Sequence, residues 1–356
     1  MTVEQMTPTG LSRHFIHKIH RGEWKTGQQV PTEAELMQQY RASRYAIRAA
    51  LKSLEERGWM KAVPGSGRRV TRDARTHALR IAFLTRCLDD VSSGQSMLLQ
   101  MAINSALNKL GHNLLTFTVN NERATVTEKD SGLQIDKAEL DGAIVMAWQY
   151  TVDDIEQLSH QLPVVSVFQD ASMARVPSFF VDFGYNAAIA VTELLRRGHK
   201  RIALIPPGSN KMQLCLEVRR GFELGLHLAG ASPDAGVVFR RDQRNSPDSS
   251  KPNHMQWLLE QTPQVTAAIF YYLPFCEELY RRSQTSGASL PDGFEVICLT
   301  DLSADMQRSR TWPDFACPFG QMGSDAVDSL ISLIVGNEPK SFSHPYYGRL
   351  RGYRSE

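Results

Sequence analysis

The sequence predicts an α/β protein: an N-terminal winged helix-turn-helix followed by a two-lobed α/β domain with parallel sheets. Three observations predict it. The balance of charge changes sign near residue 75, residues 11–71 follow a pattern of three helices and a glycine-turned hairpin, and the remainder alternates short apolar runs with helical patterns. A length of 356 residues suits two or three domains of ordinary size.

Charge is distributed unevenly along the chain. Residues 1–75 hold 14 Lys and Arg against 7 Asp and Glu, a net charge of +7, whereas the remainder holds 26 against 31, a net charge of −5. A basic end on an acidic body is typical of a chain that meets a polyanion with one end. The alternative is a basic, solvated face without a partner. Charge alone does not distinguish the two, so the pattern of residues is needed to do so.

Several classes of protein are excluded by what the sequence lacks. An apolar signal segment and a spanning run of about 18 apolar residues are both missing, which favours the cytoplasm. The five cysteines are widely spaced and contain no C-x-x-C pair, so neither a disulfide framework nor a zinc site is indicated. His14, His17 and His20 fit a polar helix face better than a metal site. With no catalytic or nucleotide fingerprint, we expect no enzyme, no metal and no cofactor.

Two helices are predicted first within residues 1–75. Leu11, Phe15 and Ile19 recur every four residues, as on the buried face of an amphipathic helix. Thr32 and Glu35 then stand in the spacing of a capping box, which marks the start of a short second helix.

A third helix follows Ser43, which can cap it. One face of that helix is apolar and formed by Ile47, Leu51 and Leu54. This leaves Arg44 and Arg48 one turn apart on the outer face, near the N-terminus. Residues 59–63 and 68–71 read as two short strands around Pro64-Gly65-Ser66-Gly67, a slim hairpin. The order of three helices and a hairpin is that of a winged helix-turn-helix.

This arrangement suits double-stranded DNA. A helix that enters the major groove N-terminus first brings its arginines to phosphates and guanine edges, which the planar guanidinium fork matches. The hairpin can approach the backbone or the minor groove. The alternative is a partner-binding helical domain whose arginines are solvated. The candidate DNA-binding residues are Thr32, Ser43, Arg44, Tyr45, Arg48, Gly65, Ser66, Gly67 and Arg68.

Four motifs within residues 11–71 resemble the DNA-binding domain of the GntR family of bacterial transcription regulators: P-T-E-A-E-L, S-R-Y-A-I-R-A-A-L, L-E-E-R-G-W and P-G-S-G. The resemblance implies a dimer on a palindromic operator, with Arg44 and Arg48 as the two recognition-helix arginines and Gly65 to Gly67 as the wing tip. Ala34 stands where an arginine is common, and Tyr45-Ala46 replaces a usual pair of threonines.

The polar segment from Arg72 to Ala78 has no periodicity, so we place the domain boundary there: 1–75 and 76–356. Beyond it, buried strands alternate with helices, which indicates parallel sheets covered on both faces. The expected strands are 79–84, 114–119, 142–146, 164–168, 202–205, 237–239, 267–271 and 295–299. The expected helices are 96–110, 152–160, 186–197, 218–229, 254–261, 275–286 and 322–335.

Two segments of this larger domain are alike. L-N-K-L-G-H-N-L-L at 107–115 and L-L-R-R-G-H-K-R-I at 194–202 both combine a helix end, a glycine, a histidine and a strand, which favours two similar lobes. A ligand of such a fold is expected beyond the carboxyl ends of the strands, in the crevice between lobes, where aromatic and charged groups suit a polyhydroxylated molecule. The candidate effector-binding residues are Arg86, Trp148, Phe168, Asp170, Arg219, Tyr271 and Asp301.

This domain also resembles the effector domain of LacI/GalR regulators, related to periplasmic sugar-binding proteins, through V-P-S-F-F-V-D-F, R-R-G-F, L-P-D-G-F-E-V-I-C-L-T-D and the Gly-His-Lys-Arg-Ile segment. The resemblance implies a small-molecule effector, usually a sugar or nucleobase, and a homodimer. Leu273-Pro274 replaces a usual Asn-Asp pair, Thr300 replaces an acid before Asp301, and Val218 stands where a sugar-contacting arginine is expected.

The sequence therefore predicts a one-component transcription regulator, in the first instance a repressor. It is expected to bind operator DNA as a dimer, without contact with a membrane, and to respond to a small molecule through a coupling free energy between the two sites. Two alternatives stay open. One is a constitutive DNA-binding protein whose α/β domain only dimerises, and the other is an α/β enzyme joined to a DNA tether.

Overall fold

The computed structural model describes residues 7–20, 23–71, 78–85, 94–118, 140–207, 212–239, 254–261, 264–285, 290–300 and 312–353. The chain divides into two compact units. The first comprises 1–91, 100–179 and 323–344, and the second comprises 92–99, 180–322 and 345–356. Within the described ranges, every helix is too short or too polar to cross a bilayer.

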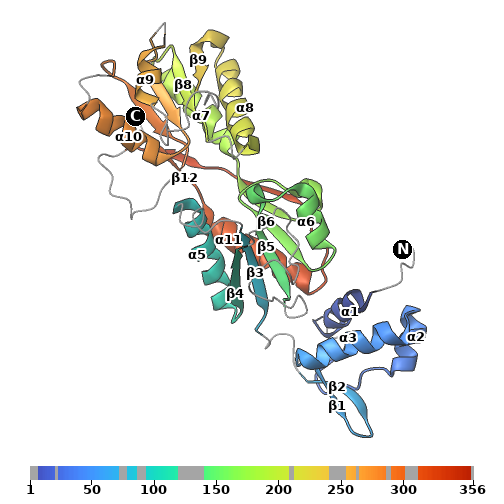
Figure 1. Cartoon of the computed structure of the whole chain (residues 1–356). Helices are drawn as coiled ribbons and strands as arrows, with labels where there is room; N and C mark the ends of the chain where they lie inside the picture. Colours follow the sequence, from blue (N-terminus) through green and yellow to red (C-terminus); the bar gives the residue numbers. More distant parts are fainter. Residues whose placement is uncertain are drawn as a thin grey trace, which may run out of the picture. The chain divides into compact units, whose positions relative to one another are not determined.

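The N-terminal domain is a winged helix-turn-helix, as predicted (Figure 1). Its elements are α1 (Pro8–His20), α2 (Glu33–Tyr40), α3 (Arg44–Glu56), β1 (Met60–Val63) and β2 (Gly67–Val70). The two strands pair antiparallel with Val63 opposite Gly67, which closes the hairpin. Leu11, Phe15 and Leu51 are fully buried in the core that the three helices share. The apolar stripes read from the sequence therefore form this core.

The first lobe is built on a six-stranded sheet with the order β13-β7-β6-β5-β3-β4. Its strands are β3 (Arg80–Thr85), β4 (Asn113–Thr118), β5 (Gly142–Met146), β6 (Val164–Val167), β7 (Ser178–Val181) and β13 (Ser343–Tyr346). Its helices are α5 (Gly94–Lys109), α6 (Val152–Ser159) and α11 (Phe319–Ile334). The five strands from β7 to β4 pair in parallel. A Cβ at Gly323 would lie 2.9 Å from the Cβ of Ala102, so glycine lets α11 pack closely on α5.

The second lobe has a six-stranded sheet with the order β14-β12-β11-β10-β8-β9. Its strands are β8 (Ile202–Ile205), β9 (Gly236–Val238), β10 (Ala267–Phe270), β11 (Glu295–Cys298), β12 (Asp314–Ala316) and β14 (Arg349–Arg351). Its helices are α7 (Phe183–Arg196), α8 (Met212–Leu228), α9 (His254–Leu259) and α10 (Leu273–Thr285). A Cβ at Gly225 would lie 2.8 Å from the carbonyl oxygen of Ala188, so α7 and α8 approach each other closely at this glycine.

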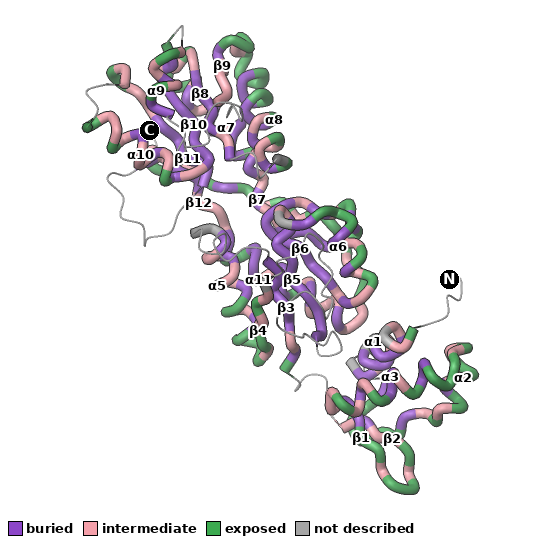
Figure 2. The backbone as a smooth tube through the Cα atoms, viewed as in Figure 1, coloured by how far each residue is buried: buried purple, intermediate pink, exposed green. Residues whose placement is uncertain are grey.

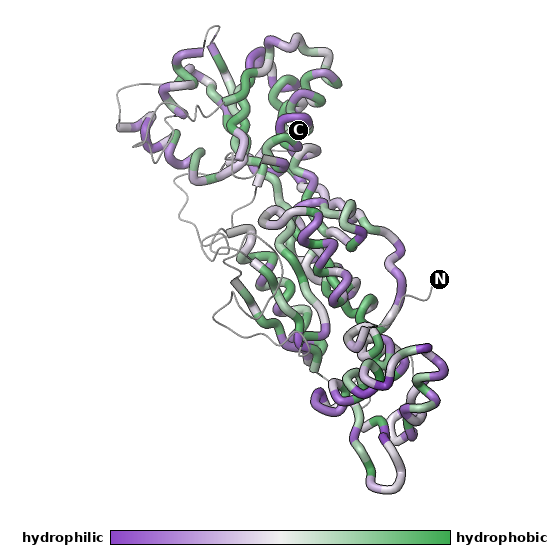
Figure 3. Tube along the Cα trace, turned by 45° about the vertical axis from the view of Figure 1, so that its right-hand side comes forward, coloured by the Kyte–Doolittle hydropathy of each residue, from purple (hydrophilic) through white to green (hydrophobic). Residues whose placement is uncertain are grey.

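The central strands of both sheets are buried, while the helices are exposed on their outer sides (Figure 2). When the trace is coloured by hydropathy, hydrophobic segments run through the interior of each lobe and hydrophilic segments lie mostly on the outside (Figure 3). The predicted strands and helices are confirmed with small shifts of their ends, except that α8 begins at Met212 rather than near Val218.

Four strands, β7, β12, β13 and β14, and one pairing direction were not predicted from the sequence. β14 pairs antiparallel with β12, so the second sheet is parallel except at this edge. The missed strands have three or four residues, and β12, β13 and β14 lie at or next to a sheet edge. Such short edge strands need no continuous apolar run, and apolar runs were the signal that located the other strands.

Candidate functional site

The outer face of α3 exposes a group of side chains near its N-terminus. Arg44, Tyr45 and Arg48 are exposed, whereas Ile47 and Leu51 on the opposite face are fully buried. The Tyr45 side chain is 78% exposed, which is unusual for so large an aromatic group and leaves it free to contact a partner. The three side chains thus form one surface that is not needed for the core.

Glu33 of α2 organises part of this surface. Its carboxylate accepts the Nε–H of Arg48 at 2.8 Å and an Nη1–H of Arg68 at 3.2 Å, and Arg68 also donates to Glu55 at 2.5 Å. Partial burial acts to raise the pKa of Glu33, but the hydrogen bonds and charges of the two arginines outweigh it and hold the pKa below its usual range. Glu33 therefore stays ionised and ties α2 to α3 and to the wing.

Two candidate DNA-binding hydroxyls serve as helix caps. The Thr32 Oγ1 atom accepts the backbone N–H of Glu35 at 3.3 Å, and the Glu35 carboxylate accepts the backbone N–H of Thr32 at 2.7 Å. That backbone hydrogen bond is the main cause that lowers the pKa of Glu35. Ser43 Oγ accepts the backbone N–H of Ala46 at 3.2 Å. Both caps place positive helix N-termini beside the exposed arginines.

The tip of the wing depends on two glycines in the left-handed region. Gly65 has a φ of 72° and Gly67 a φ of 74°, values that other residues rarely adopt. Ser66 donates its backbone N–H to Val63 O at 3.0 Å, and its Oγ accepts from Arg69 at 3.0 Å. The hairpin is consequently narrow and held by its own side chains.

The recognition helix also has a polar contact at its other end. Arg57, the C-cap of α3, forms an ion pair with Asp141 at the start of β5. The Asp141 side chain is only 2% exposed, and it also accepts the backbone N–H of Arg80 at 2.9 Å. A buried carboxylate is costly unless such donors complete it.

Two effector candidates lie close together after strands of the first sheet, whereas a third, Asp170, is bonded to the first residue of β13. Trp148 lies in the short 3₁₀ helix Ala147–Gln149 after β5, and Phe168 follows β6, with ring centroids 6.4 Å apart. Phe168 has a φ of 80°, a strained conformation for a bulky residue that is found mainly at functional sites. Asp170 accepts the backbone N–H of Ser172 at 2.9 Å and the hydroxyl of Ser343 at 3.3 Å.

The candidates of the second lobe are not brought together in this way. Tyr271 follows β10 and is fully buried against Phe183, with ring centroids 5.1 Å apart, and burial raises the pKa of its phenol well above the usual value. Arg219 lies on α8, where its Nε–H is donated to Glu223 at 2.8 Å. Arg86 and Asp301 lie outside the described residues.

Glu33 and Asp141 were not among the residues predicted from the sequence as functional partners. Glu33 could have been found, because an acid in the first turn after Thr32 lies near the N-terminus of the next helix. Asp141 could not, because its partner Arg57 is 84 residues away in the sequence.

Comparisons with known proteins divide the chain in a similar way. Residues 11–70 match the model of bacterial regulatory proteins of the gntR family, and residues 191–346 match that of the periplasmic binding protein-like domain. The arabinose metabolism transcriptional repressor of Geobacillus stearothermophilus is 22% identical over 354 residues, covering 91% of this chain and 90% of the repressor.

Solved structures show the fold of the larger domain. A LacI family transcriptional regulator from Enterococcus faecium with bound ribose is 18% identical, covers 76% of this chain and 96% of its own, and superposes with a TM-score of 0.63. A LacI transcriptional regulator from a Rhodococcus species is 17% identical, with coverages of 77% and 96% and a TM-score of 0.60.

Proposed function

We propose that this chain is a repressor that binds operator DNA as a homodimer and is modulated by a sugar. The chain is a transcription regulator that joins a gntR-type helix-turn-helix domain to a periplasmic-binding-protein-like, LacI-type effector domain. The observation that carries the proposal is the exposed surface of α3, where Arg44 and Arg48 lie one turn apart and Glu33 holds Arg48.

Operator recognition is assigned to α3 and the wing. Arg44 and Tyr45 face outward at the N-terminal end of the helix, where side chains of a recognition helix reach base edges. The guanidinium of Arg48 keeps its terminal nitrogens for a guanine or a phosphate, because Glu33 accepts only its Nε–H. Gly65 to Gly67 bring a narrow turn to the DNA backbone. At the margin of this DNA-binding surface, Thr32, Ser43 and Arg68 are proposed to contribute further contacts with DNA.

The effector is assigned to Trp148 and Phe168, at the carboxyl ends of β5 and β6 in the first lobe, and to the neighbouring loop that carries Asp170. Trp148 and Phe168 offer aromatic faces for sugar C–H groups, and Asp170 offers a carboxylate for hydroxyls. Arg86, Arg219, Tyr271 and Asp301 remain further candidates. The choice of a sugar rests on the arabinose metabolism repressor that resembles this chain and on the ribose in the Enterococcus faecium structure.

The homodimer is inferred from the operator and from α5. A chain with a single recognition helix reads one half-site, so a two-fold operator requires two chains. Met101 on α5 is 60% exposed, although an apolar side chain of its size is usually buried. A second copy of the chain would cover it.

The experiment is a selection of operator DNA by the full chain, followed by titration of the selected duplex with and without L-arabinose and D-ribose. Sequence-specific binding that either sugar changes supports the proposal. If binding is sequence-specific but neither sugar changes it or raises the melting temperature, the constitutive DNA-binding alternative is favoured. The complete burial of Tyr271, an effector candidate, is the observation that favours this alternative. Binding without sequence preference contradicts the assignment of α3.

A further inference from the structure

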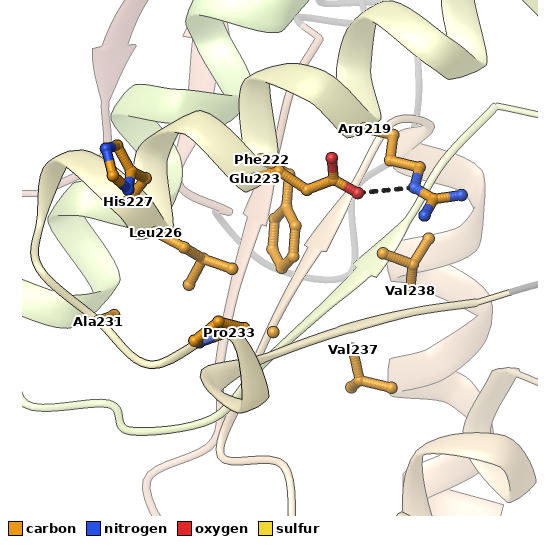
Figure 4. Close-up of a pocket in the computed structure, with 10 residues that line it drawn as sticks. Arg219, Phe222, Glu223, Leu226, His227, Ala231, Pro233, Val237 and Val238 are labelled. Atoms are coloured by element: carbon orange, nitrogen blue, oxygen red, sulfur yellow. Dashed lines mark hydrogen bonds and ion pairs between the residues drawn. The ribbon is translucent and has the colours of Figure 1, made fainter.

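The second lobe has a surface pocket between α8 and the edge strand β9 (Figure 4). Its volume of about 650 Å³ lies within the range of small-molecule sites. The lining residues are Arg219, Phe222, Glu223, Leu226, His227, Ala231, Pro233, Gly236, Val237 and Val238.

The floor of the pocket is apolar. Phe222 and Leu226 of α8 are buried, and Val238 points toward the same side from β9, whereas the Val237 side chain points to the other face of the sheet (Figure 4). A Cβ at Gly236 would lie 2.5 Å from Leu226 Cδ1 and 2.7 Å from a ring carbon of Phe222, so a larger residue here would have to push these side chains aside. The close approach produces a continuous hydrocarbon surface beneath the opening.

The rim of the pocket is polar and comes from one face of α8. Arg219, Glu223 and His227 are spaced four residues apart, which places them in a row along the helix. Glu223 accepts the Nε–H of Arg219 at 2.8 Å and so holds the guanidinium at the rim. Among the described residues, the terminal nitrogens of Arg219 have no hydrogen-bond partner, and neither does the imidazole of His227.

The pocket does not belong to the effector residues described above. Arg219 was expected among the effector residues, but none of Trp148, Phe168, Asp170 and Tyr271, the other candidates that the structure describes, lines this pocket. The preceding residue, Val218, is fully buried, and one residue along a helix turns the side chain by about 100°. Arg219 therefore opens onto the α8–β9 pocket.

We propose that the α8–β9 pocket binds a small organic monocarboxylate with an apolar body, such as an arylalkanoate. The body lies on Phe222, Leu226 and Val238, and the carboxylate accepts two N–H bonds from the terminal nitrogens of Arg219, the bidentate geometry that arginine favours. Glu223 leaves the rim with little net positive charge, which selects a single negative charge over a phosphate dianion. A neutral sugar would leave the floor uncovered.

The test is calorimetric titration of the full chain with 3-phenylpropionate, and with 3-phenylpropanamide as the uncharged analogue. Arg219→Gln is expected to weaken binding of the acid at least about tenfold, because a hydrogen bond to a charged group is lost. Arg220→Gln is the matched control, since Arg220 is exposed on the same helix and lies outside the pocket. Val238→Asp, which adds a negative charge to the wall, is expected to abolish binding.

Three results would overturn the proposal. These are the absence of saturable binding at millimolar acid, equal affinity for acid and amide, and equal loss in Arg219→Gln and Arg220→Gln. The test is independent of DNA binding, so it does not depend on the proposed repressor function.

Discussion

Arg48 of α3 donates its Nε–H to Glu33 of α2 at 2.8 Å, so the recognition helix is tied to the helix before it through the side chain expected to read DNA. The Arg48 side chain is nevertheless 63% exposed. The ion pair therefore contributes little stability in solvent but restricts the directions in which the guanidinium can point. We interpret Glu33 as a positioning residue for DNA recognition.

Glu33→Gln is expected to weaken operator binding several-fold while the melting temperature changes little, because the amide holds Arg48 and Arg68 less firmly than the carboxylate does. Fluorescence anisotropy with the selected operator measures the effect. Glu56→Gln, which removes only the exposed pair with Lys52 on α3, is the control and should bind normally. Tighter binding by Glu33→Gln would mean that the carboxylate repels phosphates instead of positioning the arginines.

The pH dependence of stability should report His254. This residue of α9 is 5% exposed among Phe239 and Phe275, and burial, assisted by the charge of Arg282, lowers its pKa to about 4. The unfolded chain takes up the proton near pH 6.5, whereas the folded chain does so only near 4. The contribution of neutral, buried His254 to the free energy of unfolding is thus fully present above pH 6.5. It is lost as the pH falls towards 4, which lowers the free energy of unfolding by about 3 kcal/mol.

Urea unfolding of the full chain between pH 7 and 4 measures this loss. His254→Phe, which fills the same aromatic site without a titrating group, is expected to flatten the dependence. Replacement of the exposed His160 by phenylalanine should leave the dependence unchanged. An unaltered slope in His254→Phe would assign the acid sensitivity to other groups.

Arg57 and Asp141 should be energetically coupled. The Asp141 carboxylate is nearly buried, so loss of Arg57 leaves it, within the described part of the chain, with the backbone N–H of Arg80 as its hydrogen-bond donor. A double-mutant cycle with Arg57→Gln and Asp141→Asn in thermal unfolding is expected to give an interaction energy of about 0.5–3 kcal/mol. Additive single effects would contradict a contact between α3 and the start of β5 in solution.

The sequence predicted the winged domain closely because its signals are local. The stripe of Ile47, Leu51 and Leu54 defines the buried face of α3, and it thereby places Arg44 and Arg48 outward. The central strands were found for the same reason, since each is a continuous apolar run.

Features that depend on distant residues were not predictable from local patterns. β14 exists because Arg349–Arg351 pair with Asp314–Ala316, and Arg351 donates to Asp314 at 2.5 Å across the two strands. The direction of Arg219 depends on how α8 packs against its neighbours, as seen in the buried Val218 and the close contact of Gly225 with Ala188, and local patterns do not give this packing. The strained φ of Phe168 has no signature in the sequence.

Met101 should lie in a dimer interface. Met101→Arg is expected to shift the full chain from dimer to monomer at micromolar concentration, because a charge in an apolar interface core is left unpaired. Sedimentation velocity measures the change, and Leu228→Arg, at another exposed apolar side chain on α8, is the control. A wild-type chain that sediments as a monomer would contradict the proposed homodimer.

The most direct test of the whole account is the ratio of operator affinity to random-DNA affinity for Arg44→Ala and Arg48→Ala, with Lys52→Ala on the same helix as the control. Each arginine variant is expected to lose about 1–3 kcal/mol of discrimination while remaining folded, because each removes one base contact. Lys52→Ala is expected to keep the ratio. An unchanged ratio in both arginine variants would contradict the claim that α3 reads the operator.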